Sequence, residues 1–348
     1  MVKFTKGSLL AHVRGYLTNY LPDQRRASEH TIRSYGNALE QLCDFVKDQR
    51  RTPLADVTFD MLDSEMILAY LSYSETGRGC SVSTRNNRLA AIRAFIKYAA
   101  SVDISTAVFA EELKKVPVKK QENTKPVGYM SMKAISTIIE QPDVTKRNGL
   151  RDRFFMILLY DTGARIDEMI RINLCDLYIA KKSKITLHGK GGKDRTIPLM
   201  DVTAKHLRKH LSEFHPGGAG SDEPLFYTET HGRCNRLSQS CIRKFLKNYG
   251  EAARKVCSEV PDSIHAHLWR HSRAMHLYQE GMDLTLVSQW LGHAQLETTL
   301  VYAHADTEHK RKAIAAATPS DSPLGKRLNP ARAAVPDDDT IKRLIGMK

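Results

Sequence analysis

The sequence reads TGARIDE at residues 162–168, HGKGGKDRTIPL at 188–199, HLWRHS at 267–272 and LGHAQLETTLVYAHA at 291–305. These four segments share cations and imidazoles, which are side chains that bind phosphate. Each segment alone is weak evidence, because a single histidine or tyrosine more often packs in a structure than takes part in chemistry. Their order and spacing together indicate a site built to hold a phosphate group.

The first two segments predict a cation near a helix start and a pair of cations on a hairpin. Gly163 permits a sharp turn between two helices, and Arg165 then lies where backbone N–H groups also favour an anion. Short β-like runs frame a glycine-rich turn in residues 184–199, which predicts an antiparallel hairpin. Lys190 and Lys193 stand at its tip and would offer mobile ammonium groups.

The last two segments place imidazoles and a tyrosine at regular distances. His267 and Arg270 are three residues apart, so on a helix they share a face. Tyr302 follows His293 by nine positions and is one of thirteen tyrosines in the chain. Only its place behind the other segments separates it from tyrosines that pack in a core.

Composition is that of a globular protein with an excess of positive charge. Apolar residues make up 41% and charged residues 26% of the 348 residues, which suffice for two domains. The 53 Lys and Arg exceed the 39 Asp and Glu and give a formal net charge of +14. This balance favours a polyanionic partner, of which nucleic acid is the commonest.

The cysteines and the apolar runs favour a soluble, cytoplasmic protein. Six scattered cysteines form no Cys-x-x-Cys pair, as is typical of reduced thiols. His231 and Cys234 have a ligand-like spacing, but no second pair stands at a matching distance, and we expect no metal site. The N-terminus lacks the apolar core of a signal peptide, and the run 154–160 is too short to cross a membrane.

Apolar periodicity divides the chain into a helical first third, a linker and a second domain. Stripes in residues 28–50 and 82–99 predict two amphipathic helices, the first capped by Ser28. The opposite side of the second helix carries cations that would grip a DNA backbone, although a solvated face is the plainer alternative: Arg85, Arg88, Arg93 and Lys97. The expected boundaries are a first domain at 1–113, a basic linker at 114–126, a second domain at 127–316 and a loose tail at 317–348, with a possible short helix at 340–345.

The four segments resemble those of the tyrosine recombinases, also called the phage integrase family, and are most similar to the Xer-type bacterial recombinases. The resemblance spans essentially the whole second domain, and residues 30–46 look more loosely like the family's core-binding domain. It implies a mainly α fold with a small antiparallel β-sheet in the catalytic domain. The helical, SAM-like core-binding domain and the catalytic domain would form a C-shaped clamp. Trp269 and Arg273 depart from the residues more usual around Arg270.

The resemblance implies that Tyr302 attacks a DNA phosphorus and becomes joined to the 3′ phosphate, releasing a 5′ hydroxyl. Arg165 and Arg270 would clamp the non-bridging oxygens, and His293 would be a third donor to them. The phosphotyrosyl ester retains the energy of the broken bond, so that rejoining requires no ATP.

Three further roles follow from the resemblance. Lys190 is favoured as the general acid that protonates the leaving 5′ oxygen, with Lys193 as the alternative. His267 would orient the nucleophile or accept its proton, and Glu168 would support the site without taking part in the chemistry. No cofactor is implied, because the cations supply the positive charge that other nucleases take from metal ions.

The implied partners are double-stranded DNA recombination sites, bound by a homotetramer on two duplexes, with an accessory recombinase as a possible further partner and no membrane. Two alternatives stay open: a type IB topoisomerase, which shares this chemistry, and a basic DNA-binding protein without catalysis. The sequence leaves open the target site and whether the protein integrates a mobile element, resolves dimers or inverts a segment.

Overall fold

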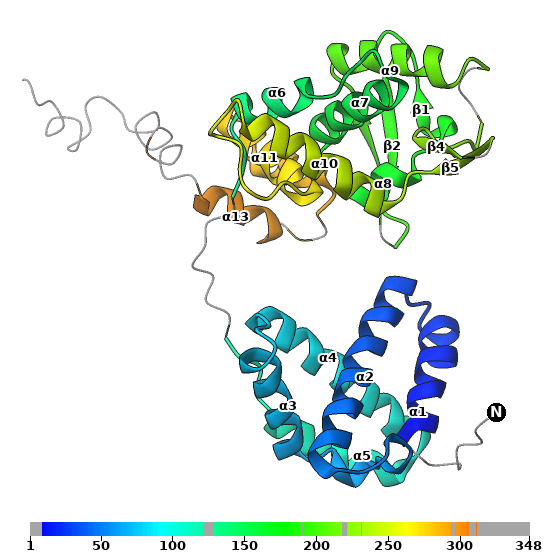
Figure 1. Ribbon diagram of the computed structural model, residues 1–348, viewed down its shortest axis with the longest axis vertical. Coiled ribbons are helices and arrows are strands. Elements are labelled where there is room, and N and C mark those ends of the chain that lie inside the picture. The colour runs from blue at the N-terminus through cyan, green and yellow to red at the C-terminus, as the bar shows by residue number, and fades with distance from the viewer. Residues whose placement is uncertain are drawn as a thin grey trace, which may run out of the picture. The chain divides into compact units, whose positions relative to one another are not determined.

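The computed structural model describes residues 9–120, 128–189, 191–217, 221–230, 232–293, 295, 297–305 and 311. The chain divides into two compact units, Met1–Thr124 and Lys125–Lys348, and each is described by itself (Figure 1). The possible helix at 340–345 lies outside the described residues. In the described ranges, none of the helices combines the length and the apolar character that crossing a bilayer requires.

The first unit is entirely helical in its described part. Its elements are α1 (Leu9–Gly15), η1 (Tyr16–Gln24), α2 (Glu29–Arg50), η2 (Leu54–Asp56), η3 (Phe59–Met61), α3 (Ser64–Thr76), α4 (Val82–Val102), η4 (Ile104–Thr106), α5 (Ala107–Glu112) and η5 (Leu113–Lys115). Ser28, Asp63 and Ser81 cap the three long helices by accepting a backbone N–H from the first turn. The N-cap predicted at Ser28 is confirmed.

The core of the first unit forms where the apolar stripes of α2 and α4 meet. Leu42 and Val46 of α2 and Ile92 and Phe95 of α4 are each at most 1% exposed. Tyr16, 1% exposed, adds an aromatic contact with Phe95 at a centroid distance of 5.6 Å. The periodicity of both stripes therefore identified the buried face of each helix correctly.

The first unit continues beyond the boundary expected at residue 113. Val116 is fully buried in its core, and the carbonyl oxygens of Val116 and Pro117 accept hydrogen bonds from Arg93 Nη2 (2.6 Å) and Arg85 Nη1 (2.7 Å). The prediction that Arg85 lies on an exposed cationic face is wrong, since Arg85 is 2% exposed. A charged side chain is expected on the surface, but Arg85 instead donates to the backbone of the segment after α5. Lys97 is exposed, as expected.

The second unit is mainly helical with two small antiparallel sheets. Its elements are α6 (Met132–Glu140), α7 (Arg147–Thr162), α8 (Ile166–Arg171), η6 (Leu174–Asp176), β1 (Leu177–Tyr178), β2 (Lys184–His188), β3 (Asp194–Pro198), α9 (Asp201–Phe214), β4 (Tyr227–Thr230), β5 (Arg233–Arg236), α10 (Gln239–Arg254), α11 (Ala266–Gln279), α12 (Leu284–Leu291) and α13 (Glu297–Ala305). One sheet has the order β1-β2-β3 and the other pairs β4 with β5. The predicted hairpin is confirmed as β2–β3.

Helix α7 lies at the centre of the second unit, packed against α6, α9 and α11 (Figure 1). Phe155, Leu158 and Leu159 of α7 are fully buried, and so is Trp269 of α11. The hairpin joins the same core through Ile185 and Leu187, whose partners across the strands are Ile197 and Arg195. One core therefore anchors four segments: the end of α7, the start of α8, strand β3 and helix α11.

Replacing Arg85 by Ala should destabilise the first unit alone by about 2 kcal/mol, because it leaves the carbonyl of Pro117 unpaired and opens a space in the core. Both tryptophans, Trp269 and Trp290, belong to the second unit. Circular dichroism should therefore show the first unit unfolding at a lower urea concentration. Tryptophan fluorescence, which reports on the second unit, should show an unchanged urea midpoint. Lys97→Ala on the exposed side of α4 is the matched control. Equal stability of the two variants would contradict this account.

Candidate active site

Arg165 stands at a tight turn between α7 and α8. Gly163 ends α7 with φ +58°, and a Cβ there would lie 2.9 Å from Leu291 Cδ2, so both the backbone and the space favour glycine. Arg165 is the N-cap of α8, and its backbone N–H donates to Glu168 Oε2 at 2.8 Å. Its side chain is 39% exposed and can reach a ligand.

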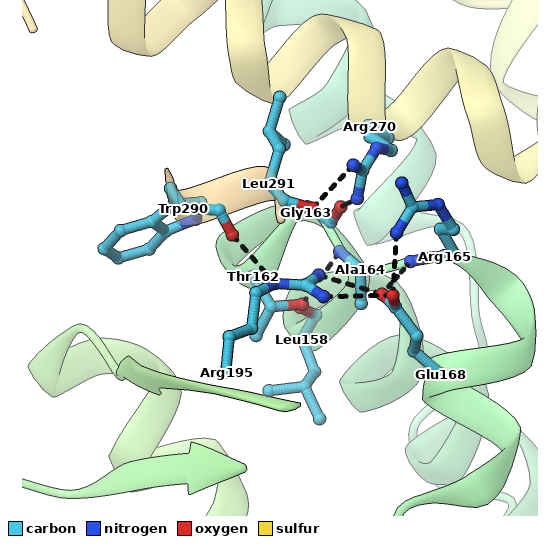
Figure 2. Close-up of polar contacts among 10 residues, drawn as sticks. All are labelled: Leu158, Thr162, Gly163, Ala164, Arg165, Glu168, Arg195, Arg270, Trp290 and Leu291. Carbon is cyan, nitrogen blue, oxygen red and sulfur yellow. Dashed lines mark hydrogen bonds and ion pairs between the residues drawn. The ribbon is translucent and has the colours of Figure 1, made fainter. Parts of the chain in front are cut away.

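Glu168 collects two arginines around one buried carboxylate, as Figure 2 shows. Its side chain is 3% exposed and its Oε1 accepts from Arg165 Nη1 at 2.9 Å. Arg195 of β3 adds a bidentate pair, with Nη1 at 2.9 Å from Oε1 and Nη2 at 2.8 Å from Oε2. Burial by itself raises the pKa of Glu168, but the hydrogen bonds from Arg195 and Arg165 and the charge of Arg195 lower it to about 2.

Arg270 is held against two backbone carbonyls. It lies on α11, is 3% exposed, and donates to Gly163 O at 2.7 Å and to Leu291 O at 2.6 Å (Figure 2). The adjacent carbonyl, Trp290 O, accepts from Arg195 Nε at 2.9 Å. Burial and the positive charges of Arg165 and Arg195 lower the pKa of Arg270 to about 9, so it remains a cation near neutrality.

The turn after α12 carries His293. Gly292 ends the helix with φ +65°, and His293 Nδ1 is 2.8 Å from Thr299 Oγ1 of α13. Burial, followed by the charges of Arg270 and Arg165, lowers the pKa of His293 to about 4. His293 is therefore neutral at pH 7, and its contact with Thr299 fixes the orientation of its ring.

Tyr302 lies buried on α13. It is 1% exposed and packs with Met275, Val287 and Leu291 in a small apolar cluster. Its hydroxyl is 2.8 Å from His271 Nδ1. Burial raises the pKa of Tyr302, and the charge of Arg270 opposes that rise. Burial, followed by the charges of His267 and Arg270, lowers the pKa of His271 to about 4, and a neutral His271 can accept the tyrosine proton in a hydrogen bond.

Most of the residues predicted from the sequence gather here, but some do not. The hydroxyl of Tyr302 contacts His271 rather than His267. The side chain of His267 is exposed on α11, and the partial burial of its ring, followed by the charge of Arg270, lowers its pKa. Lys190 lies outside the described residues, and Lys193 is exposed. His271 and Arg195 were missed. Their only signal in the sequence is that they lie next to predicted site residues. His271 directly follows Arg270, and Arg195 lies two positions after Lys193.

The described residues contain no group of three His, Cys, Asp or Glu side chains that could hold a metal ion. Cys234 is exposed on β5, and His231 lies outside the described residues. The polar groups of the site are cations and imidazoles around one carboxylate. Such a donor set suits an anion that carries several oxygens.

Comparison with known families identifies the chain. The model of the phage integrase family matches residues 128–309, and that of the phage integrase N-terminal SAM-like domain matches residues 15–102. The chain therefore belongs to the phage integrase family of tyrosine recombinases, and it is a site-specific DNA recombinase.

Relatives and solved structures agree with this assignment. The chain is 30% identical over 313 residues to the putative integrase/recombinase y4rC of Sinorhizobium fredii, covering 90% of this chain and 92% of that one. It is 31% identical to the tyrosine recombinase XerC of Rhodospirillum centenum, covering 83% and 82%. The structure of the XerH recombinase bound to its difH substrate shares the fold, with a TM-score of 0.62, 23% identity and coverage of 84% and 81%. The family resemblance, the mainly α fold with small antiparallel sheets and the two kinds of domain, all expected from the sequence, are confirmed.

Replacing Glu168 by Gln should make the second unit less stable in a pH-dependent way. The folded pKa is depressed to about 2, so the carboxylate stabilises the fold above its unfolded pKa near 4.5, and this stability is lost as pH falls from there toward 2. The expected gap in unfolding free energy at pH 7 is on the order of 2 kcal/mol.

Urea titrations followed by tryptophan fluorescence at pH 7, 5, 4 and 3 measure this gap. The exposed Glu251→Gln change on α10 is the control and should stay within about 0.5 kcal/mol of the wild type throughout. A Glu168→Gln gap that does not shrink below pH 4.5 would show that the ionised carboxylate is not what stabilises the turn.

Proposed function

We propose that this recombinase breaks DNA by attack of the Tyr302 hydroxyl oxygen on a backbone phosphorus. The oxygen forms a 3′-phosphotyrosyl bond, the bond to the 5′ oxygen breaks, and that oxygen leaves as a hydroxyl after protonation. Attack by the freed hydroxyl of a second strand reverses the steps and releases the tyrosine. Bond energy is conserved throughout, so no ATP is consumed, and the cations of the site supply the positive charge that other nucleases take from metal ions.

The observation that carries this proposal is the crowding of cations beside the tyrosine. Burial, followed by the charges of Arg165 and Arg195, lowers the pKa of Arg270. Burial, followed by the charges of Arg270 and Arg165, lowers the pKa of His293. A phosphate relieves this repulsion, and the additional negative charge of the pentacoordinate transition state relieves it further. Arg165, Arg270 and His293 would therefore bind the transition state more tightly than the ground state, which is the requirement for catalysis.

The nucleophile has to move before it reacts. Tyr302 is 1% exposed, so α13 must shift to bring the hydroxyl to a DNA phosphate. The hydrogen bond to His271 breaks in that movement. His267, exposed three residues before Arg270, is then placed to orient the hydroxyl or to accept its proton, and Glu168 supports Arg165.

The hairpin β2–β3 supplies the proton for the leaving group in this proposal. Lys190 is favoured as the general acid because of its position in the family motif, with Lys193 contacting a neighbouring phosphate. The first unit would contribute Arg88, Arg93 and Lys97 to the DNA backbone. Arg85 is left out of that set because it is buried.

The partner is double-stranded DNA that carries a recombination site. XerH has been solved with difH substrate, the Tn1549 integrase with transposon right end DNA, and lambda integrase with a COC′ core site. We extend to this chain a homotetramer on two duplexes. An accessory recombinase and a regulatory contact of the segment 340–345 with a neighbouring protomer belong to the same proposal, as does action in the cytoplasm.

Tyr302→Phe should abolish the covalent protein–DNA adduct while leaving the fold intact, since only one hydroxyl is removed. Wild-type protein is incubated with fragments of DNA that flank its gene, adducts are trapped with detergent, and the attached ends are sequenced to map the cleavage site. A duplex of that site with a nick near the scissile bond then accumulates adduct with the wild type. The wild type should cut it equally in excess EDTA.

Tyr278→Phe on α11 is the control for the loss of a tyrosine hydroxyl and should still form adduct. An adduct formed by Tyr302→Phe would overturn the assignment of the nucleophile. Recombinant junctions between two such sites, rather than relaxation of supercoils alone, distinguish this function from that of a type IB topoisomerase.

A 5′-phosphorothiolate at the scissile bond should restore cleavage to Lys190→Ala but not to Lys193→Ala, because a thiolate leaves without a proton. On the ordinary oxygen ester, Lys190→Ala should be slower by roughly 10²–10⁴-fold. Single-turnover adduct formation on both substrates measures the difference. Rescue of Lys193→Ala alone would transfer the acid role to that residue.

A further inference from the structure

Arg195 is a partly buried cation whose contacts join three parts of the site. It comes from β3, its side chain is 11% exposed, and it bonds Glu168 on α8 through both Nη atoms (Figure 2). Its Nε donates to Trp290 O on α12. Each nitrogen of the guanidinium thus has a protein acceptor, and the group is poorly placed to bind a DNA phosphate itself.

The charges around Glu168 show what Arg195 contributes. Among the described residues, Glu168 is the one carboxylate that bonds to either Arg165 or Arg195. Arg195 makes two short contacts with it, and the Arg165 side chain makes one. A bidentate pair is the stronger interaction, and with Arg195 present the group of two arginines and one carboxylate keeps a net positive charge. Arg165 is then left with positive charge to offer to a phosphate.

Arg195 also supports the turn that carries His293. A Cβ on Gly292 would lie 3.0 Å from both Cδ and Nη1 of Arg195, so the arginine packs directly against that residue. The carbonyls of Trp290 and Leu291 accept from Arg195 and from Arg270 respectively. The path of the chain into His293 is therefore fixed by two arginines that come from different elements.

We propose that Arg195 is a positioning residue for cleavage. It neutralises Glu168 so that Arg165 keeps its charge for the phosphate, and it holds the turn before His293. This inference rests on the proposed function, because it assumes that Arg165 and His293 bind the scissile phosphate. If the Arg195–Glu168 ion pair were purely structural, it would stabilise the fold but would not affect cleavage through Arg165.

The positioning role and the structural role predict different combined effects of Arg195 and Glu168 substitutions on the cleavage rate. In Arg195→Gln, the unneutralised Glu168 should draw in Arg165, and cleavage of the mapped nicked duplex should fall on the order of 100-fold, as for other misplaced groups. Adding Glu168→Gln removes the competing charge. The double variant should then cut about tenfold faster than Arg195→Gln alone, by the coupling expected of residues in contact.

A structural role makes the opposite forecast, since loss of both partners would leave the double variant as slow as Arg195→Gln or slower. That outcome, or wild-type rates for Arg195→Gln, would overturn the proposal. Arg208→Gln, an exposed arginine on α9 that bonds Ala180 O, is the matched control and should cut at the wild-type rate.

Arg195→Lys covers the case in which the Gln variant fails to fold, which tryptophan fluorescence reports. Lysine keeps the charge but loses the fork, so we expect a smaller defect of about tenfold and no gain on adding Glu168→Gln. A rate within twofold of wild type would contradict the positioning role. If Tyr302→Phe still forms adduct, the proposed function fails; if only the Arg195 results fail, the cleavage mechanism stands without this inference.

Discussion

The arrangement of the site depends on one buried carboxylate. Glu168 accepts hydrogen bonds from the backbone and side chain of Arg165 and from both Nη atoms of Arg195, and these bonds outweigh its burial and keep it ionised. A buried charge without such partners is strongly unfavourable. The carboxylate therefore fixes the turn between α7 and α8 relative to β3. This turn positions Arg165, which lies on it, and Arg270, which donates to Gly163 O.

In the proposed mechanism, a rigid anion clamp is separate from a nucleophile that has to move. Arg270 is tied to the carbonyls of Gly163 and Leu291, so it is set before any ligand arrives. Preorganised donors lose little freedom on binding and stabilise charge as it develops. Tyr302 instead lies under an apolar cluster, bonded to His271. Keeping the hydroxyl buried until α13 moves would limit cleavage to occasions when DNA holds that helix in place.

Much of the fold followed from local patterns, and the contacts of the site did not. Helical stripes, Ser28 as a cap and the β2–β3 hairpin depend on neighbours in the sequence, which periodicity and turn chemistry reveal. Arg195 and its carboxylate are 27 residues apart, and the hydroxyl of Tyr302 meets a ring 31 residues away, so only the packing of elements brings them together. Arg85 shows the same limit, because an arginine that serves the core has the sequence signature of a surface cation.

In the proposed cleavage, Tyr302 becomes joined to a 3′ phosphate of DNA. Mass spectrometry of the trapped adduct, after nuclease and protease digestion, tests it directly. We expect a nucleotide linked through its 3′ phosphate to the peptide that contains Tyr302, at that side chain. Attachment to any other residue, or linkage through a 5′ phosphate, would contradict the account.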